Sequence, residues 1–285
     1  MSKLSPACIA VGEWLKTAVA QLHGVSDSPQ LDAEILLHAV TGMHRARAYA
    51  RPEELLTREQ LEDLQVVLAR RQRGEPIAYI TRVQEFWSMP LVVSPAVLIP
   101  RPETELLVER ALELVPLNQP SRVLDMGTGS GAIALAIACA RPHAQVLAID
   151  VSDAALAIAA TNLTNLKVRN LELRRSDWYS AVVGERFDLI VSNPPYVAAD
   201  DPALAPSVAA FEPRHAVIAG ESGLEAIERI VSQAAGHLLP QGCLALEHGW
   251  KQGTEVRGLL VRAGFSRVRS HRDLAGHDRV TEGHR

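Results

Sequence analysis

The chain lacks the features that would mark several large classes of protein. None of its short apolar runs reaches the ~18–20 residues that a membrane helix needs. The stretch Met1-Ser2-Lys3-Leu4 has no apolar core of the kind found in a signal peptide. We therefore expect a protein without a membrane span that works in the cytoplasm.

Cysteine is scarce, and its spacing is informative. The three cysteines, Cys8, Cys139 and Cys243, are odd in number and far apart. A disulfide framework needs pairs, and a zinc site needs closely spaced ligands. We interpret the cysteines as small packing residues in a reducing compartment and expect no metal.

A basic excess is also missing. The formal net charge is −4, and residues 1–85 carry nearly equal numbers of basic and acidic side chains. Because neutralisation of phosphate dominates non-specific affinity for nucleic acids, this balance argues against direct nucleic-acid binding.

Residues 1–85 have the signals of a helical domain. Gly42 suits the C-terminal end of one helix. Thr57 and Gln60 have the spacing of a capping box before another. Proline-punctuated residues 86–100 follow, with two short strands predicted at 86–93 and 97–100, which we interpret as a hairpin linker.

The remaining chain, residues 101–285, alternates between helices and apolar strands. Such alternation predicts an α/β domain with a mainly parallel sheet that is covered on both faces. The predicted strands lie at 123–125, 146–150, 171–173, 187–192, 243–247, 265–269 and 279–282.

A glycine-rich segment follows the first of these strands. We call Gly127, Thr128, Gly129, Ser130 and Gly131 the glycine loop. Glycines at this position allow a tight turn and close approach of a ligand to the backbone. Asp150 ends the next strand, where a carboxylate can accept hydrogen bonds from both hydroxyls of a ribose. Together they predict a cofactor that contains adenosine.

The tetrapeptide Asn193-Pro194-Pro195-Tyr196, here called the NPPY turn, follows the strand at 187–192. Neither proline can donate to a sheet, so the strand must end in a stiff turn. Backbone carbonyls, the Asn193 side-chain oxygen and the Tyr196 ring can then hold a planar NH2 group.

S-Adenosylmethionine and NAD are both candidates for the cofactor. Gly127, Gly129 and Ala132 fit the dinucleotide pattern. However, Asp125 would sit badly near a pyrophosphate and well near a cationic amino-acid group. The NPPY turn also lies where a methyl acceptor would meet a sulfonium. We therefore favour S-adenosylmethionine, with S-adenosylhomocysteine as the product.

Several other residues could belong either to the cofactor site or to the structural framework. Trp178 could stack on the adenine, with Asp177 near its amine, or Trp178 could be a packing residue. Arg101, Glu103 and Glu105 could line the mouth of the cofactor site or simply open a helix. For His248 and Trp250 we expect a structural role at the end of a strand.

Motifs along nearly the whole chain resemble the HemK/PrmC family, the protein-(glutamine-N5) methyltransferases of peptide chain release factors. Those around Leu98 and Phe211 are the more specific ones. The motifs lie at 74–80, 85–87, 98–105, 125–131, 192–196, 211–214, 247–250 and 278–280.

The resemblance implies a class I, Rossmann-like methyltransferase. It would comprise a substrate-docking domain (1–85), a hairpin linker (86–100) and a catalytic domain (101–285). The substrate would be the glutamine of the Gly-Gly-Gln motif in class I release factors. We expect a monomer in which the glycine loop, Asp150, Trp178 and Asn193 bind the cofactor. The NPPY turn would bind the glutamine, with Asn193, Pro194 and Tyr196 as the catalytic residues.

One departure and three alternatives remain. The family usually has glycine where this chain has Arg82, which predicts local strain if the backbone there has a positive φ. The acceptor could instead be a glutamine of a ribosomal protein or the exocyclic amine of a base. The chain could also be an adenosine-binding scaffold, against which the intact NPPY turn argues.

Overall fold

The computed structural model describes residues 9–202 and 204–285, so Met1 to Leu4 and Cys8 lie outside the described residues. The chain divides into two compact units, one ending at Arg82 and the other covering Val83–Arg285. The domain boundary predicted after residue 85 therefore falls three residues late, inside the strand Val83–Phe86. No helix in the described ranges is long and apolar enough to cross a bilayer.

The N-terminal unit is helical. Its core contains Trp14, Leu36 and Leu64. The predicted capping box is present, because Gln60 N–H donates to Thr57 Oγ1 (3.2 Å) and Thr57 N–H donates to the Gln60 side chain (2.9 Å). The helices are α1 (Val11–Leu22), α2 (Pro29–Thr41), α3 (Arg45–Ala50), α4 (Arg58–Gln72) and α5 (Ile77–Thr81).

A hairpin of β1 (Val83–Phe86) and β2 (Met89–Val92) opens the second unit. The predicted strands at 86–93 and 97–100 were therefore wrong in position. Trp87 and Ser88 form the turn, both with positive φ (52° and 58°). Two-residue turns of this kind usually contain Asn or Gly, so this pair gave no turn signal.

Two side chains from later helices hold this hairpin. Glu105 Oε1 accepts a hydrogen bond from Trp87 N–H (2.9 Å). The Asn162 amide accepts from Val92 N–H (2.7 Å) and donates to the Val92 carbonyl (3.0 Å). The same amide donates to the Ser130 carbonyl in the glycine loop (2.9 Å). Asn162 therefore connects the hairpin to the glycine loop.

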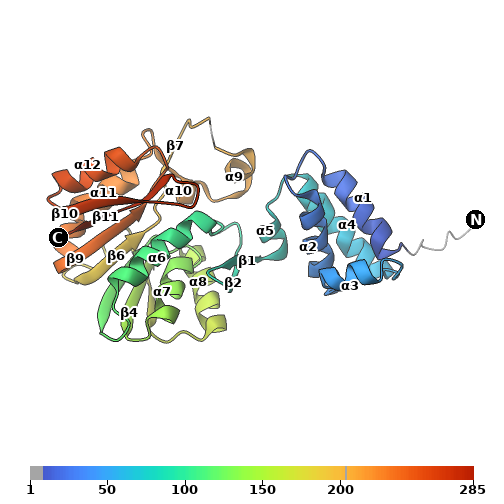
Figure 1. The fold of residues 1–285 in the computed structure, drawn as a ribbon, viewed down its shortest axis with the longest axis horizontal. Coiled ribbons are helices and arrows are strands. Elements are labelled where there is room, and N and C mark those ends of the chain that lie inside the picture. Colours follow the sequence, from blue (N-terminus) through green and yellow to red (C-terminus); the bar gives the residue numbers. More distant parts are fainter. Residues whose placement is uncertain (1–8, 203) are drawn as a thin grey trace, which may run out of the picture. The chain divides into compact units, whose positions relative to one another are not determined.

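A seven-stranded sheet forms the centre of the second unit (Figure 1). Its order is β10-β11-β9-β6-β3-β4-β5, and the run from β9 to β5 is parallel. This confirms the predicted α/β fold with a mainly parallel sheet. The strands are β3 (Ser121–Met126), β4 (Ala144–Asp150), β5 (Leu171–Arg175), β6 (Phe187–Ser192), β9 (Leu238–Glu247), β10 (Ser266–Arg272) and β11 (Asp278–His284).

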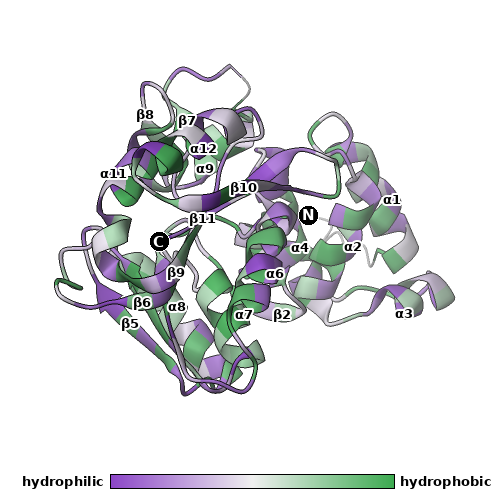
Figure 2. Ribbon diagram, turned by 60° about the vertical axis from the view of Figure 1, so that its left-hand side comes forward, coloured by the Kyte–Doolittle hydropathy of each residue, from purple (hydrophilic) through white to green (hydrophobic). Residues whose placement is uncertain are grey.

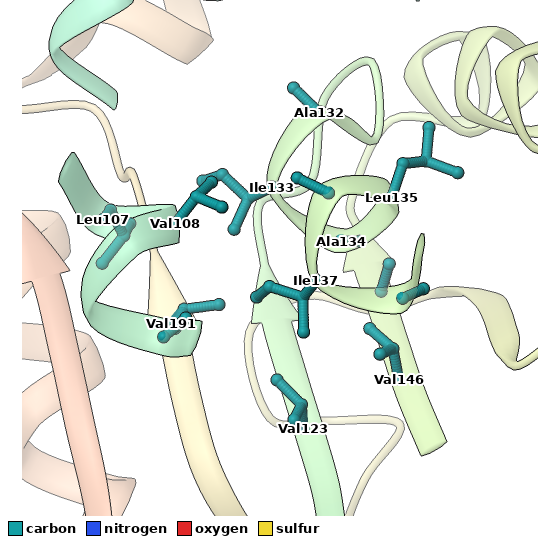
Figure 3. Packing of buried hydrophobic residues seen from close by; sticks show 14 of the residues in the cluster. Leu107, Val108, Val123, Ala132, Ile133, Ala134, Leu135, Ile137, Val146 and Val191 are labelled. Atoms are coloured by element: carbon teal, nitrogen blue, oxygen red, sulfur yellow. The ribbon is translucent and has the colours of Figure 1, made fainter. Parts of the chain in front are cut away.

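Helices cover both faces of this sheet. Neighbouring residues of the central strands point to opposite sides, so each face has apolar side chains against which helices pack. Val123 packs with α6 and α7, as Figure 3 shows, whereas Leu124 packs with α11 and α12. Figure 2 shows α7 as hydrophobic, in keeping with its complete burial from Ala132 to Ala138. The covering helices are α6 (Glu105–Leu114), α7 (Ala132–Ala140), α8 (Asp153–Leu166), α11 (Glu225–Ala234) and α12 (Gly253–Arg262).

The segment between β6 and α11 contains short elements that sequence periodicity did not indicate. Each spans six residues or fewer, which is too short for a helical or alternating pattern to show. They are β7 (Val197–Ala198), α9 (Pro206–Phe211), α10 (Arg214–Val217) and β8 (Ile218–Gly220). Two 3-10 turns complete the fold, η1 (Pro102–Thr104) and η2 (Ala235–His237).

Arg82, the departure noted in the sequence, does have a left-handed backbone (φ 62°). A residue with a side chain destabilises the folded state by ~1–2 kcal/mol in this conformation. Glycine avoids that strain, but part of the gain is offset because glycine loses more backbone entropy on folding. Arg82→Gly should therefore raise the free energy of unfolding, measured by urea denaturation, by up to about 1 kcal/mol. Arg82→Ala, which keeps the strain, is the control; equal stability of the two variants would contradict this explanation.

Candidate active site

The glycine loop joins β3 to α7 at the carboxyl edge of the sheet. Gly127 and Gly129 have positive φ (74° and 56°), and a Cβ added to either would meet no described atom within 4 Å. These residues follow the central strand β3, with β4 on one side and β6 on the other. Sheets of this type bind ligands at such a switch point. The loop therefore exposes backbone to a ligand.

The Asp125 side chain contacts the glycine loop. Its carboxyl group is buried, with Oδ2 accepting from Thr128 Oγ1 (2.6 Å) and Ala134 N–H (3.2 Å). Burial raises the pKa of Asp125 to about 7, although these hydrogen bonds act in the opposite direction. Oδ2 thus anchors the glycine loop internally, whereas Oδ1 has no hydrogen-bond partner among the described residues. The expected proximity of this carboxyl group to the cationic part of a cofactor stays a prediction.

Asp150 faces the glycine loop from the end of β4. Its Oδ2 accepts from Gly129 N–H and its Oδ1 from Ser152 N–H, both at 2.9 Å. A carboxylate oxygen can accept two hydrogen bonds, so each oxygen keeps one acceptor position for a ligand. The carboxylate is half-buried and oriented by the backbone, as a ribose-binding group requires.

Trp178 borders the same space as Asp150. It has a positive φ (52°), is half-buried and packs against the core that contains α11. The Arg229 guanidinium lies 5.5 Å from its ring centroid and pairs with Asp177 at 3.3 Å. Trp178 thus both packs and faces the pocket, so the two interpretations from sequence are compatible.

These groups line one pocket, here called the glycine-loop pocket. Its walls are mostly apolar and include a stretch from 96 to 100 that sequence analysis did not identify as part of the site. The lining includes the predicted residues Gly127, Thr128, Gly129, Ser130, Asp150, Trp178, Asn193 and Pro195. Gly131 is outside this lining and is the N-cap residue of α7.

The NPPY turn separates this pocket from a second one, here called the tyrosine pocket. Asn193 and Pro195 line both pockets, whereas Pro194 and Tyr196 line the tyrosine pocket. The other residues of the tyrosine pocket come from the segment before η1 and from the short elements after β6: Leu98, Arg101, Val197, Asp201, Leu204, Ala205, Val208, Ala216 and Val217. Asn193 is thus placed to contact one ligand from each side.

Polar side chains from other elements form hydrogen bonds with two residues of the NPPY turn. Asn193 Nδ2 donates to Thr104 Oγ1 (3.1 Å), and the Tyr196 hydroxyl donates to Glu247 Oε1 (3.2 Å). The side chain of Glu247 is fully buried at the end of β9. Burial raises the pKa of Glu247 to about 7, while the Thr104 hydroxyl and Arg279 act to lower it. Burial and the Glu247 charge also raise the pKa of Tyr196.

Arg101 and Glu105, undecided from sequence, have structural contacts. Arg101 pairs with the buried Glu212, which also accepts from Ile99 N–H (3.1 Å). This pair ties the segment after β6 to the wall of the site. Glu105 binds the hairpin turn, as described above.

His248 has the structural role expected for it. Its ring is buried, and Nε2 lies 2.7 Å from Thr281 Oγ1 on β11. Trp250 is 53% exposed and lies against His277, with ring centroids 5.1 Å apart. Neither belongs to the described lining of the two pockets.

Sequence reasoning missed Thr104, Glu247 and Glu212 as parts of the site. Each belongs to a motif that the family resemblance quoted, but a motif does not show which distant residue its members contact. Among the residues that the structure describes, no group of three or more His, Cys, Asp or Glu could hold a metal.

The fold and the glycine-loop pocket define a class I methyltransferase. The family described as "Methyltransferase small domain" matches residues 102–210, and the "PrmC N-terminal domain" matches residues 13–81. Solved structures share the fold. A methyltransferase from Pyrococcus furiosus matches with a TM-score of 0.53 at 20% identity, over 70% of this chain and 89% of that one.

A 16S rRNA N2 G1207 methyltransferase from T. thermophilus, in complex with AdoMet and guanosine, matches with a TM-score of 0.54 at 23% identity. The match covers 71% of this chain and 49% of that one. At such low identities these structures inform on the fold alone.

Much closer relatives carry the name release factor glutamine methyltransferase. The protein from Salmonella typhimurium is 51% identical over 95% of this chain and 97% of its own length. Those from Escherichia coli and Shewanella oneidensis are 48% and 44% identical, with coverage of 95% or more on both sides. The chain belongs to the release factor glutamine methyltransferase family.

The geometry of Asp150 leads to a binding prediction. Asp150→Ala removes two acceptor positions, and hydrogen bonds to a charged group contribute ~1.5–3 kcal/mol each. The dissociation constant for S-adenosylmethionine, measured by calorimetry, should rise by about 100-fold or more. Asp153→Ala, three residues further on an exposed surface, is the control and should leave it unchanged. Unaltered affinity in Asp150→Ala would contradict the assignment.

Proposed function

We propose that this protein transfers the methyl group of S-adenosylmethionine to the side-chain amide nitrogen of glutamine in the Gly-Gly-Gln motif of class I release factors. The similarity to named release factor glutamine methyltransferases over 95% or more of the chain carries this proposal. It includes the helical N-terminal unit, which we propose as the docking domain for the release factor.

In this proposal S-adenosylmethionine occupies the glycine-loop pocket. Asp150 accepts hydrogen bonds from the ribose hydroxyls, Trp178 packs against the adenine, and the glycine loop contacts the amino-acid part. The cofactor supplies an activated methyl group, so the protein's task is to orient the acceptor. Orientation of the two reactants can lower a barrier by several kcal/mol.

The substrate glutamine enters the tyrosine pocket. Its amide NH2 donates to Asn193 Oδ1 and to the Pro194 carbonyl, Pro195 stiffens the turn, and Tyr196 packs against the amide plane. The oxygen of Asn193 faces the substrate in this arrangement because its Nδ2 is already bound to Thr104. The substrate's nitrogen lone pair then points at the methyl carbon.

The transfer needs no dedicated base. A bond forms from the glutamine nitrogen to the methyl carbon as the bond from carbon to sulfur breaks and its electron pair stays on sulfur. S-Adenosylhomocysteine leaves as a neutral thioether, and the alkylated nitrogen releases one proton to water. Hydrogen bonds from the NH2 group to Asn193 and Pro194 stabilise the positive charge that develops on nitrogen.

Two further expectations accompany the proposal. The cytoplasm is where a release factor would be encountered, and the monomeric state expected from sequence stays a prediction. Neither nucleic acid nor metal is required by the reaction as written.

Labelling identifies the acceptor. Radiolabelled S-adenosylmethionine should label purified class I release factor, with the label on the glutamine of the Gly-Gly-Gln motif as located by peptide mass spectrometry. Release factor with that glutamine changed to alanine is the control and should stay unlabelled. Label found only in ribosomal protein or only in RNA would overturn the proposal in favour of that acceptor.

Asn193→Ala tests the role of the NPPY turn. Loss of one acceptor for the substrate NH2 should lower kcat by about 100-fold or more, because the donor and acceptor geometry is no longer fixed. The affinity for S-adenosylmethionine should change much less. Asn165→Ala, at an exposed position on α8, is the matched control. Turnover near that of the unmodified enzyme would refute the assigned role.

A further inference from the structure

The fully buried Glu247 has no part in the reaction described above, although it lies directly behind the NPPY turn. Its Oε1 accepts from the Tyr196 hydroxyl (3.2 Å). Its Oε2 is buried without a hydrogen-bond partner of good geometry among the described residues, although the Thr104 hydroxyl is close enough to lower its pKa. A buried carboxyl with one unsatisfied oxygen is costly and calls for an explanation.

The charge state of Glu247 determines how the neighbouring hydroxyl groups are oriented. A carboxylate only accepts hydrogen bonds, so the Tyr196 hydroxyl turns its hydrogen toward Oε1, and a nearby hydroxyl such as that of Thr104 is favoured to turn its hydrogen toward the carboxylate as well. Thr104 then presents a lone pair on its other side, and Asn193 Nδ2 donates to that lone pair (3.1 Å). With Nδ2 held in this way, the Asn193 oxygen is the atom left for the pockets.

We propose that Glu247 is a positioning residue that sets the orientation of the Asn193 amide through Thr104 and that of the Tyr196 ring through its hydroxyl. This inference rests on the proposed function, since it assumes that Asn193 presents its oxygen to an NH2 group. Glu247 contacts neither the methyl donor nor the acceptor. It acts by fixing which end of a nearly symmetrical amide faces the substrate.

Ionisation of Glu247 is the state that fixes this orientation. A protonated Glu247 can itself donate to Thr104, whose hydrogen is then free to turn toward Asn193. The Asn193 amide can consequently rotate and present Nδ2, a donor, to the donor NH2 of the substrate. The protonated enzyme therefore loses the selective orientation, and activity should rise with pH as Glu247 ionises.

The charged and titratable groups around Glu247 come from three neighbouring elements. Arg279 on β11 favours the ionised form, and Glu103 in η1 opposes it. Tyr196 in the turn donates to the carboxylate, and its own pKa is raised, so it stays protonated. Burial is the largest effect and raises the pKa of Glu247 to about 7. The transition between the two states thus falls near neutral pH.

Glu247→Gln is the direct test. The amide has nearly the same shape but can donate to Thr104 at every pH. The single-turnover rate of methyl transfer should fall between about 10- and 100-fold. The affinity for S-adenosylmethionine, measured by calorimetry, should change less than about twofold, because Asp150 and the glycine loop are intact. The single-turnover rate of the unmodified enzyme should rise with pH near neutrality, which gives its pH profile an acid limb. The profile of Glu247→Gln should lack that limb.

A double-variant cycle separates positioning from general damage. Thr104→Val removes the hydroxyl that transmits the effect, and Thr104→Ser should retain most of the activity. If Glu247 acts on Asn193 through Thr104, adding Glu247→Gln to Thr104→Val should slow the enzyme much less than Glu247→Gln slows the unmodified enzyme, with the remaining loss due to Tyr196. Rates that multiply independently would overturn the proposed connection.

Glu282→Gln is the matched control for burial. Glu282 is also fully buried, on the adjacent strand β11, and it pairs with Arg110 and Arg269 away from the NPPY turn. This variant should lose stability but keep its rate per folded enzyme and its acid limb. Equal loss of rate in Glu282→Gln and Glu247→Gln, or a Glu247→Gln rate and pH profile like the unmodified enzyme's, would refute the inference.

The experiments distinguish a failure of the proposed function from a failure of the role assigned to Glu247. If the unmodified enzyme labels a different NH2 acceptor, the acceptor assignment falls, and the same variants are then compared on that acceptor. If it labels the release factor but Glu247→Gln behaves as unmodified, only the role of Glu247 falls.

Discussion

Parallel pairing of β6 between β3 and β9 is the constraint on which the site depends. Asp125 pairs with Val191, and Ser192 pairs with Leu246. All three strands consequently end at one edge of the sheet. The glycine loop, the NPPY turn and Glu247 therefore meet although they are far apart in sequence. Ser192 strengthens this arrangement, because its hydroxyl donates to the Met126 carbonyl (2.6 Å).

The parts of the site that depend on local chemistry could be predicted from sequence. Glycines after a strand, an acid at the end of the next strand and two prolines after a third each indicate a position at the sheet edge. The alternation of strands and helices then places them together. These rules involve only a residue and the element next to it, so they needed no knowledge of long-range contacts.

The parts that depend on contacts between distant residues could not be predicted. Asp125 has the sequence position of a ligand-binding group, but one of its carboxyl oxygens turns inward to Thr128 and Ala134. Thr104 and Glu247 lie in separate motifs, and no spacing rule relates either to Asn193. The hairpin was misplaced because Trp87 and Ser88 form a turn whose backbone usually favours other residues. Tertiary contacts such as that with Glu105 decide such cases.

In the proposed reaction, selectivity for the acceptor is divided between distant parts of the chain. A planar NH2 group on glutamine and one on a base present the same two donors to the NPPY turn. In the proposed reaction the turn therefore specifies the kind of nitrogen, whereas docking specifies the molecule that carries it. Because Asn193 and Pro195 line both pockets, the two proposed ligands would meet across one stiff turn. A change of acceptor during evolution would need changes elsewhere in the chain rather than in this turn.

Asn162 also affects how the protein behaves among other chains. A two-stranded hairpin has free edges, and a free edge can pair with a strand from another molecule. The Asn162 amide binds both the N–H and the carbonyl of Val92, as a neighbouring strand would. It thereby occupies the edge of β2 with a single side chain. The contact that connects the hairpin to the glycine loop thus also leaves Val92 without free backbone groups for a strand of another molecule.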